Sequence, residues 1–291
     1  MTEQINRGTG LLLIEAISSN PNGDPDRESD PRTRQDGRGE ISPVSFKRKL
    51  RDLVSEKESP FWKDIAKELE LPNQGFDVLE SKDTKRTDVK VMLPDAITAK
   101  YWDVRVFGTT FLEEQTDEAK SFITTGVAQF GLGVSLDPVK IERMTTTKVL
   151  PVEDDKSKGM APLAFRIVSY GLYAMPFFIN ATAAHKTHCS KKDIDLLLKL
   201  IPHAYPETAS YIRSQVFVRH AFYTEHNRAR GTFSDFKMIE ALTPQRISGA
   251  VGAATSWKDY DAEMLAQNIA KLNKDILKDK ASPIVDLMDQ M

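Results

Sequence analysis

The sequence has almost no cysteine and no long apolar run. Cys189 is the only cysteine among the 291 residues, so a disulfide within the chain cannot form. Such cysteine usage is typical of a reducing compartment. The first apolar run, residues 11–14, is too short for a signal-peptide core or a membrane span. We therefore expect a cytoplasmic protein with no membrane partner.

The sequence also lacks an excess of positive charge. It has 40 Lys and Arg against 42 Asp and Glu, for a net charge of −2. Nucleic-acid binding therefore has no global basic signal, although binding depends on the local field rather than on the total charge. A composition of 40% hydrophobic and 28% charged residues is ordinary for a globular protein. This length can bury a core as one elaborated domain or as two small ones.

Several catalytic and cofactor motifs are absent from the sequence. It contains no phosphate loop, no G-x-S-x-G elbow and no H-E-x-x-H pair. Gly126, Gly131 and Gly133 are spaced like a loose glycine-rich loop, but close packing of strands is the better default. His185 and His188-Cys189 offer metal ligands without a second cluster, so we expect a solvated loop there. We predict neither a metal nor a cofactor.

Residues 20–40 are rich in Asn, Pro, Gly, Asp and Arg and follow a predicted buried strand at 11–17. A loop this long in a compact domain is usually functional or disordered. Asp24, Asp26 and Asp30 could begin a calcium loop or serve a metal-assisted nuclease. An Asx-turn network that shapes the loop is the alternative, and we favour it.

A helix is predicted to follow this loop. Ser42 and Pro43 are a typical helix start. One face of this helix carries the apolar residues Phe46, Leu50, Leu53 and Val54. Around that face lie the cations Lys47, Arg48, Lys49 and Arg51. Such cations can reach a bound anion while their stems stay packed, or they can form an ordinary solvated helix face.

The rest of the chain mixes strands and helices without regular alternation, which predicts an α+β fold. We expect further helices at 61–69, 193–201 and 262–277, a loop at 81–90, and strands at 122–134, 141–149, 165–179 and 215–223. The polar stretch 150–162 suits the tip of a long hairpin.

Together these segments resemble the backbone subunit of type I CRISPR Cascade complexes, of the Cas seven family in the RAMP superfamily, closest to the type I-B and I-C members. The resemblance rests on Asn-Pro-Asn-Gly-Asp-Pro-Asp at 20–26 and Ser-Phe-Lys-Arg-Lys-Leu-Arg at 45–51. Asp-Val-Arg-Val-Phe-Gly at 103–108, Gly-Val-Ala-Gln at 126–129, Ser-Leu-Asp-Pro-Val at 135–139 and Tyr-Gly-Leu-Tyr at 170–173 follow in the family order. Two departures are Val127-Ala128 in place of Pro-Val, and Lys158-Gly159-Met160 in place of a basic Gly-Arg-Lys stretch.

The resemblance implies an RRM-like (ferredoxin-like) palm with an inserted helical region at about 55–100. A long β-hairpin thumb would span about 145–164, and residues 1–291 would form a single elaborated domain. Copies of such a subunit polymerise along one CRISPR RNA and leave its bases free to pair with target DNA. The implied partners are the CRISPR RNA, target DNA, other copies of the chain and other Cascade subunits. No enzyme activity is implied.

The RNA-binding residues that the resemblance implies belong to two groups. Those of the palm and its loop are Asn22, Arg34, Lys47, Arg48, Lys49, Arg51, Arg105 and Gln129. Those of the thumb are Lys148, Lys158 and Met160, with Leu150 as another candidate wedge. Because guide sequences vary, these residues should contact phosphates and riboses. Two alternatives stay open: a metal-dependent endoribonuclease of the same superfamily that uses Asp24 or Asp26, and a protein-interaction module with an incidental basic helix.

Overall fold

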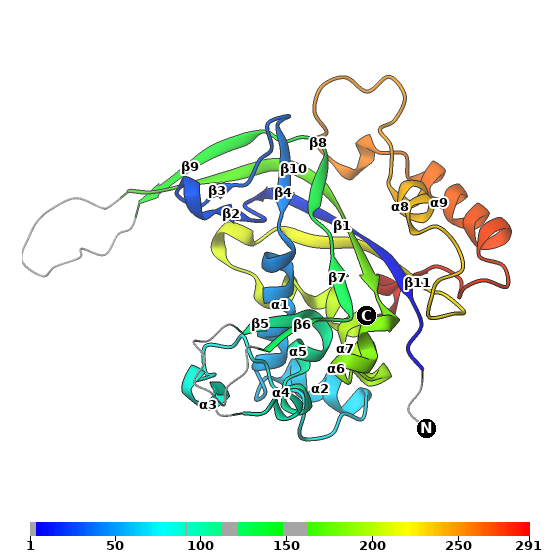
Figure 1. The fold of residues 1–291 in the computed structure, drawn as a ribbon. Helices are drawn as coiled ribbons and strands as arrows, with labels where there is room; N and C mark the ends of the chain where they lie inside the picture. The colour runs from blue at the N-terminus through cyan, green and yellow to red at the C-terminus, as the bar shows by residue number, and fades with distance from the viewer. Residues whose placement is uncertain (1–3, 91, 112–121, 148–161) are drawn as a thin grey trace, which may run out of the picture.

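The protein is a mixed helix-and-sheet structure built around an antiparallel sheet (Figure 1). The computed structural model describes residues 4–90, 92–111, 122–147 and 162–291. The strands are β1 (Gly8–Ser19), β2 (Gly23–Asp24), β3 (Asp30–Pro31), β4 (Arg38–Ile41), β5 (Gly108–Phe111), β6 (Phe122–Thr125), β7 (Ala128–Phe130), β8 (Gly133–Pro138), β9 (Ile141–Thr147), β10 (Pro162–Ile179), β11 (Val216–Glu225) and β12 (Val285–Asp286). The helices are α1 (Pro43–Ser55), α2 (Pro60–Glu68), α3 (Arg86–Lys90), α4 (Pro94–Lys100), α5 (Trp102–Phe107), α6 (Ala181–Thr187), α7 (Lys191–Leu200), α8 (Asp235–Leu242) and α9 (Ala262–Lys271).

Strand β1 lies in the middle of the main sheet. The strand order is β12-β11-β1-β10-β8-β4, and β7 and β9 also pair with β10. Gly8 pairs with Ile179 of β10 on one side and with Glu225 of β11 on the other. The first strand therefore pairs with two segments that come much later in the chain.

The middle of strand β1, residues 11–14, is continuously apolar because the sheet is covered on both faces. Leu12 and Ile14 enter one hydrophobic core, whereas Leu11 and Leu13 enter a second core on the opposite face. All four side chains have 0% exposure. Alternate residues of a strand point to opposite faces, so a sheet covered on both sides needs a continuous apolar run. The predicted buried strand is confirmed, and it extends at both ends.

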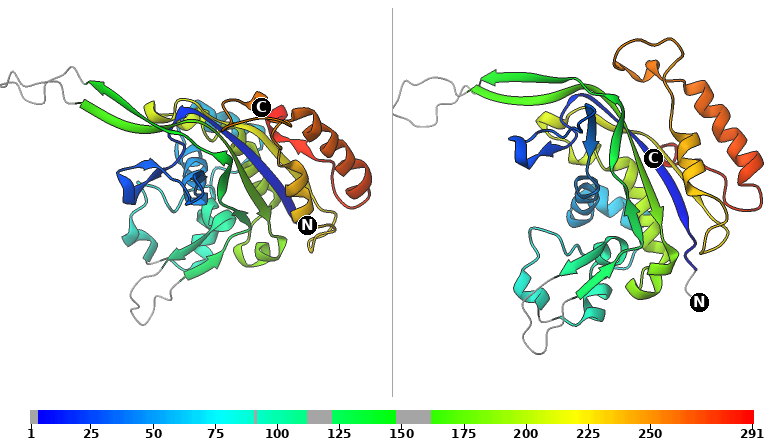
Figure 2. Two further views of the ribbon diagram at one scale, coloured as in Figure 1. Left: turned by 90° about the horizontal axis from the view of Figure 1, so that it is seen from above. Right: turned by 45° about the horizontal axis from the view of Figure 1, so that its top comes forward.

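Strands β9 and β10 form a hairpin that extends away from the body of the sheet (Figure 2). Their pairing runs from Ile141 opposite Val168 to Thr147 opposite Pro162. The other half of β10 stays in the main sheet beside β1. The expected hairpin tip, with Lys148, Lys158 and Met160, lies outside the described residues.

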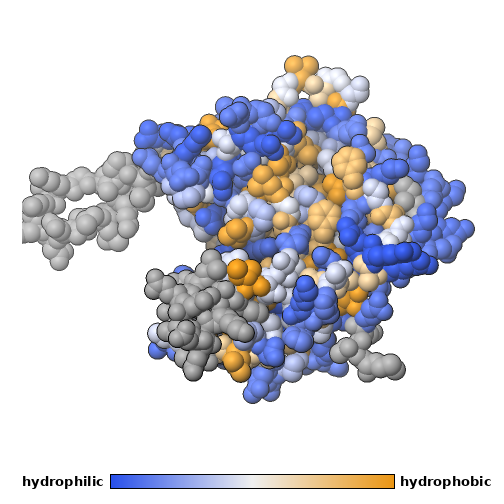
Figure 3. Space-filling model, in the orientation of Figure 1, coloured by the Kyte–Doolittle hydropathy of each residue, from blue (hydrophilic) through white to orange (hydrophobic). Residues whose placement is uncertain are grey.

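The second core lies between the sheet and the helices α8 and α9. Met238 and Leu242 of α8 and Leu265 of α9 are buried there. The outer side of this layer is mainly hydrophilic (Figure 3). The loop between the two helices contains Ile247 and Val251, which are 46% and 95% exposed.

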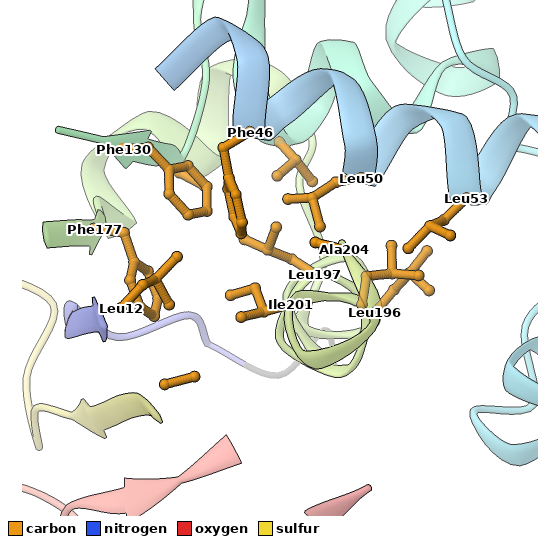
Figure 4. Packing of buried hydrophobic residues seen from close by; sticks show 14 of the residues in the cluster. Leu12, Phe46, Leu50, Leu53, Phe130, Phe177, Leu196, Leu197, Ile201 and Ala204 are labelled. Atoms are coloured by element: carbon orange, nitrogen blue, oxygen red, sulfur yellow. The ribbon is translucent and has the colours of Figure 1, made fainter. Parts of the chain in front are cut away.

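The first core lies between the sheet and α1 and α7 (Figure 4). Phe46, Leu50 and Leu53 of α1 point toward the helical segment that carries Leu197 and Ile201. The start of α1 confirms the sequence prediction, because Ser42 accepts a hydrogen bond from the Ser45 N–H and Pro43 is the first helical residue. The predicted apolar face is also confirmed, since Phe46, Leu50, Leu53 and Val54 are all buried.

Three sequence-based boundaries need correction. Residues 81–90, expected as loop, include helix α3. The last predicted helix, at 262–277, is α-helical as far as Lys271 and continues as a π-helix over Leu272–Ile276. The expected strand at 122–134 is divided into β6, β7 and the start of β8. Gly126 marks the first break, because a Cβ there would lie 2.2 Å from the backbone of Phe107. In the described part of the chain, no helix is long and apolar enough to cross a membrane.

Candidate nucleic-acid interface

The loop that follows β1 is fixed to the start of α1 by Asn22. The Asn22 Oδ1 atom accepts hydrogen bonds from the Ser42 N–H at 2.8 Å and from the Ser42 hydroxyl at 2.9 Å. Its amide donates to the Gly23 carbonyl, and the residue is only 7% exposed. Asn22, predicted to bind RNA, therefore holds the loop after β1 against the start of α1.

The aspartates of this loop take part in local hydrogen bonds and ion pairs. Asp24 Oδ1 accepts from the Asp26 N–H at 3.2 Å and caps a short 3₁₀ turn. Asp30 forms an ion pair with Arg166 of β10. This is the Asx-turn geometry that competes with a metal-site interpretation. Among the described residues, no group of three or more His, Cys, Asp or Glu is placed to hold a metal ion.

The expectation of a solvated loop at 185–189 is wrong, because His185 lies in the last turn of α6 and Cys189 is buried directly after it. His188 ends α6 with φ +55°. Cys189 is buried, and burial raises the pKa of its thiol well above the ordinary value. A buried, protonated thiol is a poor nucleophile and a poor metal ligand.

Arg51 of α1 is part of a buried ion pair. Its Nε donates to Asp103 Oδ2 at 2.9 Å, and its Nη1 lies 3.1 Å from Glu80 Oε2. Asp103 is 1% exposed and also accepts from the backbone N–H of Leu79 at 2.7 Å. Arg51 itself is 5% exposed. Its role is therefore to join α1 to α5, which does not support the expected RNA contact.

Arg105 is equally committed to the interior. It forms an ion pair with Asp193 at 2.7 Å and donates to the carbonyls of Gly75, Thr98 and Ala99. Its Nε also donates to Asp193, so every N–H of the guanidinium has an acceptor. With 7% exposure, Arg105 lies inside the protein rather than at the palm surface. This geometry does not support the expected RNA contact either.

Lys47 and Arg48 are the half-buried cations of α1. Lys47 Nζ lies 5.2 Å from the centre of the Phe107 ring, and burial followed by the nearby Arg51 charge lowers its pKa. No described carboxylate forms an ion pair with Lys47. Arg48 pairs with Asp52 at 2.7 Å and donates to the Glu80 carbonyl. Of the two, Lys47 is the more available for an added anion.

Lys49 is a buried cation without a carboxylate partner among the described residues. It is 5% exposed, and its Nζ donates to the Thr208 hydroxyl at 3.0 Å. The ammonium also lies 5.0 Å from the centre of the Tyr205 ring. Burial, and then the charge of Arg213, lowers the pKa of Lys49 to about 8. An anion beside Lys49 would relieve this unfavourable charge burial.

Sequence reasoning missed Arg32 and Arg213, which carry buried polar atoms without a partner. The Nε atoms of both, and the Tyr205 hydroxyl, have no hydrogen-bond partner within the described structure. Arg32 lies in the loop after β1, and its backbone N–H donates to the Asn22 carbonyl. Buried polar atoms are normally satisfied, so each such group calls for an explanation. Phosphate oxygens are acceptors that guanidinium groups of this kind bind.

Backbone pairing brings these cations to the same end of the sheet. The Asn20 N–H, directly after β1, donates to the Ile212 carbonyl at 2.7 Å, next to Arg213. Arg213 lies close enough to Lys49 for its charge to lower the Lys49 pKa, and Arg32 belongs to the loop after β1. We use the name cationic crevice for these three residues, Arg32, Lys49 and Arg213. No local pattern could have revealed it, because its members come from three distant parts of the chain.

The remaining described candidates lie in two different places: Arg34 belongs to the loop after β1, whereas Gln129 pairs with Phe178 near the start of β1. Arg34 is exposed, with its Nε 3.7 Å from Glu40 Oε1. Gln129 of β7 donates to the Gly126 carbonyl at 3.0 Å and holds the turn that precedes β7. The structure thus gives Arg34 freedom to reach a ligand and gives Gln129 a local structural contact.

The base of the β9–β10 hairpin carries two arginines in register. Arg143 of β9 lies opposite Arg166 of β10, and both are exposed. Like charges placed directly opposite each other destabilise a sheet. The Asp30 carboxylate compensates one of them and connects the hairpin to the loop after β1. A bound polyanion would compensate the other.

The sequence matches one protein family over most of its length. Residues 6–265 match the family described as "CRISPR-associated protein Cas7". A relative of that name from Haloferax volcanii is 25% identical over 228 residues, which cover 66% of this chain. The match spans 62% of the length of that relative.

Two solved structures also resemble the fold. One is a "CRISPR RNA-guided surveillance complex" chain with a TM-score of 0.49 and 14% identity, covering 92% of this chain and 84% of the other. The second is a chain of such a complex in a "pre-nicking" state, with a TM-score of 0.48 and 15% identity, covering 92% and 89% of the two chains.

Proposed function

This chain belongs to the CRISPR-associated Cas7 family, and from that premise we propose that it is a CRISPR RNA-binding backbone subunit of a type I surveillance (Cascade) complex. In this role copies of the chain polymerise along the guide RNA and present it for pairing with target DNA in antiviral defence. Its partners are the CRISPR RNA, target DNA, other copies of itself and other Cascade subunits. The sequence resemblance favours the I-B or I-C subtype.

The observation that carries the proposal is the cationic crevice. Two arginines, Arg32 and Arg213, carry unpartnered buried Nε atoms, and the charge of Arg213 adds to the unfavourable burial of the Lys49 charge. A phosphate supplies several acceptor oxygens and negative charge, so it would satisfy all three groups. Arginine and lysine that contact phosphates position a strand without reading its sequence. A guide-holding subunit needs this kind of contact, since the guide changes from one spacer to the next.

The arrangement of the sheet supports a palm-and-thumb interpretation. The palm, which we take to be RRM-like, contains β1, β10 and β11 with α1 and α7 on one face. The β9–β10 hairpin is the base of the thumb, which would reach about residues 145–164. Helices α2 to α4 fall in the helical insertion at about 55–100. All of these parts belong to one elaborated domain in this proposal.

We further propose that the subunit is not itself a nuclease. Asp24 caps a turn and Asp30 pairs with Arg166, whereas Asp26 is exposed. The test is cleavage of a complementary target RNA with Mg²⁺ or Mn²⁺. We expect no cleavage above that of a D24N/D26N variant. Cleavage that disappears in this variant would establish the endoribonuclease alternative instead.

The central test removes charge from the crevice while keeping side-chain volume. The variant R32M/R213M should bind RNA more weakly, and by the same factor for unrelated sequences. The dependence of log affinity on log salt should lose about 1.4 units for two lost phosphate contacts on a single strand. The matched control is K67M/K271M, which removes two exposed cations far from the crevice.

Two results would contradict the guide-holding function. One is a loss of affinity for only one RNA sequence, which would indicate base readout. The other is an unchanged affinity and salt dependence in R32M/R213M. The mass of the purified protein before and after ribonuclease treatment tests polymerisation separately, because an RNA-templated filament should shrink on digestion.

A further inference from the structure

A second cationic surface lies at the other end of β1. A hollow of about 500 Å³ is lined by Arg228, Arg230 and Lys280, with Asp279 as its one acid. We call it the basic hollow. All three cations are exposed, and none forms an ion pair with a described carboxylate. In a chain with a net charge of −2, this is a local positive field that the total conceals.

The two loops that form the basic hollow are connected to each other and are therefore preorganised. The Asn227 N–H donates to the Lys280 carbonyl at 2.9 Å, and the Asn227 side chain donates to the Asp279 carbonyl at 3.0 Å. The Thr232 N–H donates to His226 Nδ1 at 2.9 Å, and His226 is 0% exposed. Cations on a fixed frame lose little conformational entropy when a ligand binds.

An aromatic surface adjoins the basic hollow. A neighbouring hollow of about 710 Å³ shares Arg230 and Phe233 with it and is also lined by Phe178 and Phe236. Phe236, in the first turn of α8, is 72% exposed, which is unusual for so large an apolar side chain. Cations beside an exposed aromatic ring are the combination that binds single strands, through phosphate contacts and base stacking.

The basic hollow is too far from the cationic crevice to be part of the same contact. At the basic hollow, the carbonyl of Arg7, just before β1, accepts a hydrogen bond from the His226 N–H. At the crevice, the N–H of Asn20, just after β1, donates to the carbonyl of Ile212. The strand between them has 12 residues, which at about 3.3 Å per residue separate its ends by up to about 40 Å.

We propose that the basic hollow and the adjoining surface around Phe236 bind a single-stranded nucleic acid other than the strand held at the cationic crevice. Arg228, Arg230 and Lys280 contact its phosphates, and Phe236 stacks on a base. An acidic protein partner fits less well, because its carboxylates would pair with the cations but would offer no base to stack on the exposed Phe236 ring. The inference does not depend on the crevice binding a guide.

The experiment measures binding of a fluorescein-labelled oligo-deoxythymidine to the protein with its copurified RNA, and the probe is chosen because a guide of mixed sequence has no oligoadenosine run to pair with it. R228A/R230A should reduce the salt slope by about 1.4. F236A should weaken binding about tenfold or more with an unchanged salt slope. The control K271A/K274A removes two exposed cations of the same C-terminal region and should bind like the unmodified protein.

Further arms separate this site from the crevice and from other ligands. R32M/R213M should keep its affinity for the oligonucleotide while its RNA affinity falls, which would show two independent sites. An equal loss of affinity for the RNA and for the oligonucleotide in that variant would overturn the second site. So would unchanged oligonucleotide binding in R228A/R230A and F236A, or equally tight binding of duplex DNA, whose bases cannot stack on Phe236. If RNA binding fails altogether while the Arg228 and Phe236 effects persist, the guide-holding function falls and this proposal stands.

Discussion

Replacement of Arg51 by alanine separates a structural cation from an RNA-binding one on the same helix. The change removes the buried partner of Asp103, which is 1% exposed and lies 2.9 Å from Arg51 Nε. Loss of one member of a buried pair leaves the other charge unpaired and typically costs about 3–5 kcal/mol. Asp103 would keep the backbone N–H of Leu79 at 2.7 Å, so we expect the lower end of that range. The Glu80 contact adds little, because that side chain is 55% exposed.

Urea denaturation of the RNA-free protein, followed by tryptophan fluorescence, measures this loss. R48A is the matched control, because Arg48 is on the same helix but its ion pair with Asp52 is exposed, and it should cost less than about 1 kcal/mol. The double variant R51M/D103N removes both charges and should recover part of the stability lost in R51A. If R51A unfolded like the unmodified protein but lost RNA affinity, Arg51 would be a phosphate contact and the structural role argued above would be wrong.

Three further outcomes are expected. RNA affinity should fall as the pH rises above about 8, because the Lys49 side chain must be protonated to bind phosphate. The fall should be at most about tenfold per pH unit. Fluorescence anisotropy of labelled RNA measures it, and the K49M variant should show no such decline. The G10A variant should lose roughly 1–3 kcal/mol of unfolding free energy in urea denaturation, since the added Cβ would lie 2.1 Å from the Phe177 ring. A G10A variant of unchanged stability would refute the close packing of that ring on β1. Burial alone would raise the pKa of Asp235, but its hydrogen bonds hold that pKa well below the usual value. These hydrogen bonds therefore stabilise the protein fully above about pH 4, and their contribution to stability decreases as the pH falls below that. A D235N variant that lost as much stability in acid as the unmodified protein would contradict this.

Local sequence signals predicted the local parts of the interface. The Ser42-Pro43 start and the spacing of Phe46 and Leu50 fix α1 and its buried face, as the structure confirms. Those signals depend on residues within a few positions of one another. The same helical pattern placed Lys47 and Arg51 among the cations around that face but could not distinguish them.

The difference between these cations arises from distant partners. Arg51 meets Asp103, 52 residues later, and Arg105 meets Asp193, 88 residues later. No local pattern distinguishes a cation that will be paired across the fold from one that will stay free. The cationic crevice was missed for the same reason, because Arg213 reaches it through the chain that leads into β11. The family resemblance supplied the expected function, whereas the structure decides which side chains remain available for it.

The position of β1 in the middle of the sheet has a consequence for how the protein is made. Its partners, β10 and β11, begin at residues 162 and 216, so the ribosome must add more than a hundred residues before β1 can pair on either side. At about 5–20 residues per second this delay lasts on the order of ten to thirty seconds. During this time β1 is an apolar segment of the nascent chain with both of its edges unpaired, and such a segment is prone to aggregate. Nascent chains that stall before β10 should therefore engage chaperones, and their release should coincide with the emergence of residues 162–179 from the exit tunnel.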